Sequence, residues 1–128
     1  MTKQPMAGTD MDFSIEDHAI DDDTHVVAVA GEIDLFTAPA FKQRISAPID
    51  AGRTRLIVDL TAATFIDSSS LGVLIGAHRR LKRRGGTMAV VCENDAIIKT
   101  FRITGLDSVF RLVRTVDEAF NGDAVSAG

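Results

Sequence analysis

After residue 25, the sequence alternates between short apolar runs and longer segments whose apolar residues recur every three to four positions. The short runs are typical of buried strands, and the longer segments are typical of amphipathic helices. Neighbouring parallel strands must be joined by a long crossover, which is usually a helix. The alternation therefore predicts an α/β fold, in which a mixed, largely parallel sheet of four to five strands is covered by about four helices.

The chain is expected to open with a β-hairpin. Met11, Phe13 and Ile15 alternate with polar residues, as in a half-buried strand, and the acidic residues 21–23 then mark a turn. The later strands and helices follow from the same patterns. Further strands are predicted at 26–30, 55–60, 87–92 and 109–112, and helices at 37–48, 68–84, 95–103 and from 115.

Local signals set the predicted helix ends. Thr37 is a candidate cap for the first helix, and Pro48 should end or kink that helix. The glycines at 85–86 should close the second helix. Thr115 and Glu118 have the spacing of a capping box, so a last short helix should begin there.

Length and composition predict one globular domain. The chain has 128 residues, of which 45% are apolar and 25% charged. We expect loose tails at residues 1–10 and 121–128 around a domain at residues 11–120. No apolar stretch approaches the ~20 residues that span a bilayer, and residues 1–8 lack a signal peptide's apolar region. A cytoplasmic protein without a membrane partner is therefore expected, with the single cysteine, Cys92, acting as a small buried hydrophobe.

The charge distribution argues against direct nucleic-acid binding. The net charge is −4, whereas general nucleic-acid binders carry a basic excess. Residues 78–84 are densely basic, but cations are favoured in the last turn of a helix, and the run has no aromatic residue on which a base could stack. An alternative is that Arg79 and Arg83 extend a protein-binding surface toward an acidic patch.

The segment 65–72 is the most unusual in the chain. An apolar pair is followed by Asp67 and three serines, Ser68, Ser69 and Ser70, at the expected start of a helix, and Gly72 lies within that helix. Asp and Ser are preferred N-cap residues, and capping explains one of these positions. It does not explain four small polar residues in a row.

Helical geometry divides the following helix into two faces. The expected core face carries Leu71, Leu74, Ala77, His78 and Leu81. The opposite stripe carries Ser68, Gly72, Ile75, Gly76, Arg79 and Arg83. Two glycines on an exposed helix each cost about 1 kcal/mol relative to alanine, which suggests a surface that another backbone approaches closely. The alternative is that both glycines pack under a loop of the same domain.

A phosphate on Ser68 would lie at a helix N-terminus, where free N–H groups and the helix dipole favour anions. The fold should therefore tolerate the modification. A partner docked on the same stripe would not, because phosphorylation adds about −1.5 to −2 charges. Ser68 is thus a candidate switch residue, with Ser69 as the second choice.

Three motifs resemble the STAS family, and within it the bacterial anti-sigma factor antagonists. The family pattern Asp-Ser-(Ser/Thr)-Gly-Leu-Gly is similar to residues 67–72, with Ser70 in place of the usual glycine. The pattern Gly-Glu-(Ile/Leu)-Asp followed by Thr-Ala is similar to residues 31–34 and 37–38. A third signature is similar to residues 103–106 followed by 109–110. The resemblance covers about residues 11–120 and implies a STAS-like fold.

The resemblance also implies a function without catalysis or cofactor. Ser68 matches the position that an anti-sigma factor, itself a serine kinase, phosphorylates. The unmodified antagonist binds this kinase and frees the sigma factor, and a metal-dependent serine phosphatase resets the switch. Asp34 matches a carboxylate near the phosphorylation site that contributes to partner recognition. The predicted partner-binding residues are Asp34, Asp67, Ser69, Gly72, Ile75, Gly76 and Arg79.

Other functions fit the sequence less well. A receiver domain with Asp59 as acceptor would need a helix between its first two strands. A serine hydrolase would need the Gly-x-Ser-x-Gly motif, which Ser68 lacks, and no histidine cluster suggests a metal site. A scaffold or sensor subunit of a stress-signalling assembly shares the fold and stays open as the alternative. The sequence leaves the oligomeric state open.

Overall fold

The computed structural model describes residues 13–127, with side chains described as far as Asn121. The strands are β1 (Phe13–Ala19), β2 (Thr24–Ile33), β3 (Arg55–Ile66), β4 (Thr87–Val91) and β5 (Arg111–Val113). The helices are α2 (Ala38–Asp50), α3 (Ser68–Arg83), α4 (Asp95–Ile103) and α5 (Val116–Ala127), with a short 3-10 helix η1 (Leu106–Ser108). The predicted order of elements and the α/β class are confirmed.

The five strands form one sheet in the order β1-β2-β3-β4-β5. β1 pairs antiparallel with β2, as the predicted hairpin requires, and the other pairs are parallel. The pairing of β2 with β3 runs from Thr24 opposite Arg55 to Ile33 opposite Ile66. Because these two strands end at the same edge of the sheet, the loops that follow Ile33 and Ile66 leave it side by side.

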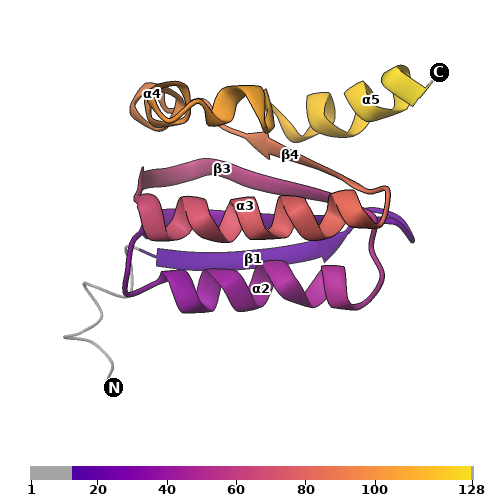
Figure 1. The fold of residues 1–128 in the computed structure, drawn as a ribbon, viewed down its shortest axis with the longest axis horizontal. Helices are drawn as coiled ribbons and strands as arrows, with labels where there is room; N and C mark the ends of the chain where they lie inside the picture. The colour runs from indigo at the N-terminus through magenta and orange to yellow at the C-terminus, as the bar shows by residue number, and fades with distance from the viewer. Residues whose placement is uncertain (1–12, 128) are drawn as a thin grey trace.

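The helices bury both faces of this sheet. Phe41 of α2, Leu74 of α3 and Phe101 of α4 join one large core cluster against the strands. Ala119 of α5 belongs to a smaller cluster on the other face. Figure 1 shows α2 and α3 running alongside each other across the sheet, with α4 and α5 beyond β4. Within residues 13–127, no helix is long and apolar enough to cross a membrane.

Several predicted boundaries were wrong. β2 continues past Gly31 to Ile33, because a bulge and the positive φ of Gly31 (89°) keep the strand paired. β3 continues to Ile66 because it follows β2 to the sheet edge. Pro48 does not end α2, which runs to Asp50. Its ring is buried in the last turn, where it removes only one backbone hydrogen bond.

The predicted end of α3 and start of α5 agree with the structure more closely. Gly85, with φ of 74°, follows the end of α3 as predicted. Thr115 Oγ1 accepts the N–H of Glu118 at 3.0 Å, but the Glu118 carboxylate accepts the N–H of Arg114 instead of completing the capping box. α5 is helical to Ala127, whereas the sequence predicts a loose tail from residue 121. The predicted tail at residues 1–10 lies outside the described residues.

Candidate functional site

One backbone carbonyl joins the end of β2 to the start of α3. The oxygen of Ile33 accepts the N–H of Asp67 at 3.2 Å and the hydroxyl of Ser70 at 2.9 Å. The Asp67 carboxylate in turn accepts the N–H of Ser70 at 3.1 Å and so caps the helix. This joint fixes the orientation of the first turn of α3 at the C-terminal edge of the sheet.

The three serines of the first turn have different environments. Ser68 is the first residue of α3 and is exposed. Ser69 is half-buried and borders a groove between α3 and α2. Ser70 is completely buried, with its hydroxyl directed at Ile33. An enzyme that acts on a serine hydroxyl can therefore reach Ser68 without moving the helix, whereas it cannot reach Ser70.

Asp34 lies at the start of the neighbouring loop and holds that loop together. Its carboxylate accepts the N–H groups of Phe36 and Thr37 at 3.0 and 3.1 Å, while the Thr37 hydroxyl accepts the N–H of Asp34 at 2.8 Å. Thr37 is the N-cap residue of α2 as predicted, but its side chain makes no capping hydrogen bond to the helix, because its hydroxyl is used in this loop. Asp34 and Asp67 follow the paired residues Ile33 and Ile66, so both carboxylates lie at the edge of the sheet where Ser68 is exposed.

The two predicted faces of α3 are confirmed. Leu71, Leu74, Ala77 and Leu81 are buried, whereas Ser68, Gly72, Gly76, Arg79 and Arg83 are exposed and Ile75 is half-buried. A Cβ atom built at Gly72 or Gly76 would meet nothing within 4 Å. The alternative that these glycines pack under a loop of the same domain is therefore wrong for residues 13–121. The glycines leave this side of α3 open.

His78 lies at the margin of the core face, between α3 and η1–β5. Its ring contacts the ring of Phe110 edge to face, with 5.5 Å between centroids. Burial lowers the pKa of this imidazole, and the nearby Lys82 lowers it further. Its Nδ1 is buried and has no hydrogen-bond partner among the described residues.

Three exposed apolar side chains at the edge where β2 and β3 end are not among the predicted partner-binding residues. Leu35 and Phe36, in the loop after β2, are 65% and 87% exposed, and Phe65 near the end of β3 is 48% exposed. The sequence contains one sign that Leu35 and Phe36 are exposed, because both lie in a loop and outside any periodic pattern. Exposed apolar residues that gather at one edge mark an interaction site.

The described residues of the site contain no group that could hold a metal ion. No group of three or more His, Cys, Asp or Glu side chains between residues 13 and 121 could hold a metal ion. Cys92 is buried, and burial raises the pKa of its thiol. What the arrangement offers is an accessible hydroxyl at a helix start, flanked by carboxylates, exposed apolar side chains and an open helix face.

The chain is similar to known proteins over most of its length. A family model described as the STAS domain matches residues 17–119. The anti-sigma-B factor antagonist of Listeria monocytogenes is 34% identical over 113 residues, which are 88% of this chain and 98% of that protein.

Two solved structures are also similar. The crystal structure of an anti-sigma factor antagonist from Mycobacterium paratuberculosis is 36% identical, with a TM-score of 0.74 over 86% of this chain and 91% of that one. SpoIIAA, a Bacillus cell fate determinant solved in its phosphorylated form, is 25% identical, with a TM-score of 0.68 over 84% of this chain and 97% of that one.

The role of the Ser70 hydroxyl can be measured as stability. Replacing Ser70 with alanine removes the bond to Ile33, and we expect the free energy of unfolding in urea to fall by about 1 kcal/mol. Ser69→Ala is the matched control, since that side chain is half-buried and makes no hydrogen bond to another described residue; its effect should stay within about 0.5 kcal/mol. Equal effects of the two substitutions would contradict the assigned joint.

Proposed function

The chain belongs to the STAS domain family, and we propose that it is an anti-sigma factor antagonist that phosphorylation of Ser68 switches off. The observation that carries the choice of residue is the exposure of Ser68 beside the buried Ser70. In the unmodified state, the protein binds an anti-sigma factor that is a serine kinase, and the sigma factor is released. A metal-dependent serine phosphatase restores this state. The protein acts in the cytoplasm and catalyses no reaction itself.

The proposed docking surface combines exposed and half-buried residues at the start of α3, in the neighbouring loop and along the open side of the helix. It consists of Asp34, Leu35, Phe36, Phe65, Asp67, Ser68, Ser69, Gly72, Ile75, Gly76 and Arg79. Phe36 and Phe65 supply aromatic area of the kind that concentrates binding energy at protein interfaces. Gly72 and Gly76 allow a partner to approach the α3 backbone closely, because nothing in the domain covers them. A surface of this kind supports protein binding better than binding of a small substrate.

Phosphorylation would affect the fold and the interface in opposite ways. Ser68 is the first residue of α3, where the unpaired N–H groups of the first turn and the helix dipole favour a negative charge. The same charge, about −1.5 to −2, would lie within the docking surface beside Asp34 and Asp67. Like charges brought together at an interface cost several kcal/mol, which weakens binding by about a hundredfold or more. The phosphorylated SpoIIAA structure supports the existence of such a modification among similar proteins.

The phosphorylation site is tested with the kinase that the unmodified protein captures. Incubation with this kinase and ATP should place one phosphate on Ser68, and peptide mass spectrometry identifies the residue. Ser68→Ala should abolish the modification, whereas Ser69→Ala, the adjacent control, should leave it in place. A phosphate on Ser69 or Ser70 would contradict the assignment.

The same kinase serves for the binding measurement. Ser68→Ala should bind it as the unmodified protein does, whereas Ser68→Asp should keep the circular dichroism spectrum of the fold and bind about a hundredfold more weakly. Equal affinity of the two variants would count against the switch.

The open face of α3 is tested at Gly76, where an added side chain should stabilise the fold and weaken binding of the partner. Gly76→Gln should raise the free energy of unfolding by up to about 1 kcal/mol, since glutamine is the better helix former and meets no neighbour. It should weaken binding roughly tenfold through overpacking at the interface. Gly76→Ala is the control, with a similar gain in stability and a smaller loss of affinity. A lower melting temperature for both variants would show that the face is not open.

A further inference from the structure

A groove of about 540 Å³ runs between α2 and α3. Ser69 borders it near the start of α3, and Gly72 and Gly76 form part of its floor. Four cationic residues also line it, Lys42 from α2 and Arg79, Arg80 and Arg83 from α3, whereas no aspartate or glutamate does. The groove thus begins beside Ser68 and extends away from it along α3.

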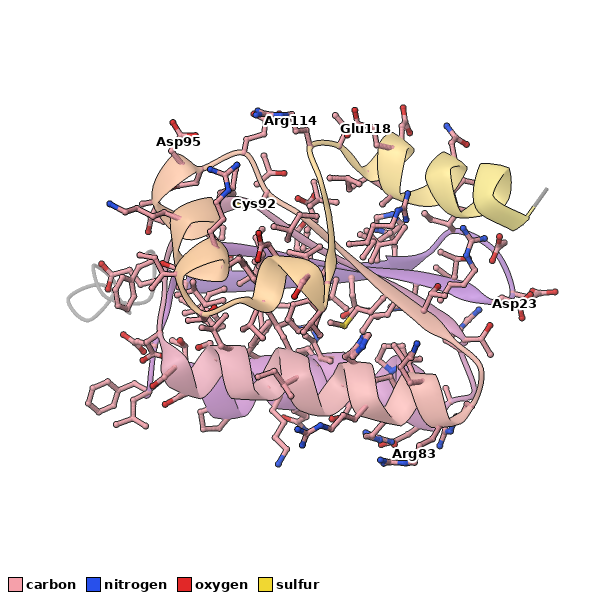
Figure 2. All side chains as sticks on the ribbon, turned by 45° about the horizontal axis from the view of Figure 1, so that its top comes forward. Asp23, Arg83, Cys92, Asp95, Arg114 and Glu118 are labelled. Carbon is pink, nitrogen blue, oxygen red and sulfur yellow. The ribbon has the colours of Figure 1, made fainter. Side chains whose placement is uncertain are left out.

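The cations near this groove fall into two groups. Arg80 pairs with Asp50, and Arg84 donates to the carbonyl of Ile49, so these two arginines tie the end of α2 to α3. Lys42, Arg79 and Arg83 make no hydrogen bond or ion pair with any described residue between 13 and 121. Figure 2 shows Arg83 projecting outward from the end of α3. Polar contacts within the domain therefore explain Arg80 and Arg84, whereas the three other cations have no polar partner among the described residues and are available to a ligand.

These free cations contrast with the charge of the whole molecule. The chain carries a net charge of −4, so a groove with four cations and no carboxylate is a local reversal of sign. A surface of this kind attracts anionic partners and raises their rate of association.

The spacing of the free cations favours an extended ligand over a compact one. The pairing of Arg80 with Asp50 sets the register of the two helices and places Lys42 beside the turn that contains Gly72. Arg83 lies 11 residues beyond Gly72, which is about 16 Å along the helix axis. A single phosphate or carboxylate could not contact both ends, whereas a peptide segment with several acidic residues could.

We propose that the groove between α2 and α3 binds an acidic segment of the anti-sigma factor, a proposal that rests on the function proposed above. The segment lies along Lys42, Arg79 and Arg83, and one of its ends reaches the first turn of α3. A phosphate on Ser68 then repels this acidic segment directly, in addition to disturbing the contacts of Leu35 and Phe36. The cations of the groove thus attract the acidic segment, and a phosphate on Ser68 repels the end of the segment that reaches the first turn of α3.

The test compares two double variants that change the net charge equally. Lys42→Glu combined with Arg83→Glu reverses two groove charges. Lys82→Glu combined with Lys99→Glu reverses two exposed charges that do not line the groove, and Lys82 is the sequence neighbour of Arg83. Binding to the anti-sigma factor kinase captured by the unmodified protein is measured over a range of salt concentrations, and circular dichroism checks that each variant folds.

The groove variant should bind about tenfold or more weakly, mainly through a slower association rate, and its salt dependence should be flatter than that of the unmodified protein. The control variant should stay within about twofold. If both variants lost affinity equally, the effect would come from net charge and the proposal would be overturned. The proposal would also be overturned if both variants bound as tightly as the unmodified protein.

Two further outcomes separate this proposal from its premise. If the unmodified protein binds no anti-sigma factor, the proposed function fails and this inference fails with it; if it binds and the groove variant binds equally well, only the inference fails. Hydrogen exchange of the complex should show protection of α2 and of the last turns of α3. Protection of the same turns by a second copy of this chain, without the anti-sigma factor, would overturn the proposal.

Discussion

The functional end of this domain depends on the carbonyl oxygen of Ile33. It accepts hydrogen bonds from the backbone of Asp67 and from the hydroxyl of Ser70, and so it holds the last residue of β2 against the first turn of α3. Successive residues of a helix are rotated by about 100°, so a side chain two positions before Ser70 points away from the sheet. Once Ser70 is directed at Ile33, Ser68 must face solvent and Ser69 must face α2. The exposure of Ser68 is thus a consequence of the joint.

The charges along α3 are arranged in the same direction as its dipole. Asp67 precedes the helix, Asp34 lies beside it, and the cations Arg79, Arg80, Lys82 and Arg83 occupy the last two turns. Carboxylates near the start and cations near the end of a helix both stabilise it. The same arrangement gives the exposed face an acidic end and a basic end. A partner that is complementary to both ends has one preferred orientation along the helix, and added negative charge at Ser68 changes the charge of the end at which the helix begins.

The sequence predicts the fold well because each strand and helix carries its own periodic pattern. The core face and the exposed face of α3 follow from helical geometry alone, and they are confirmed between Leu71 and Arg83 except at Ile75 and His78, which are half-buried. Contacts between distant segments leave no such local signal. Pro48 stays in the helix in its last turn, where the ring is buried, and the Thr37 hydroxyl bonds with Asp34 in the preceding loop and does not cap α2. The exposure of Phe36 has no signal in the sequence beyond its place in a loop, and an aromatic residue next to a helix start is equally consistent with a core position.

Ser70 illustrates how a departure from a family pattern can be explained by packing. Glycine is usual at this position of the motif, and a serine there makes the sequence ambiguous, since three adjacent hydroxyls have similar chemistry. The structure separates them by environment, because the Ser70 hydroxyl is buried and donates to Ile33. A glycine would leave that carbonyl with the N–H of Asp67 as its partner and would give the first turn more conformational freedom. The serine therefore restricts the turn that presents Ser68, and a kinase meets an ordered backbone at the residue it is proposed to modify.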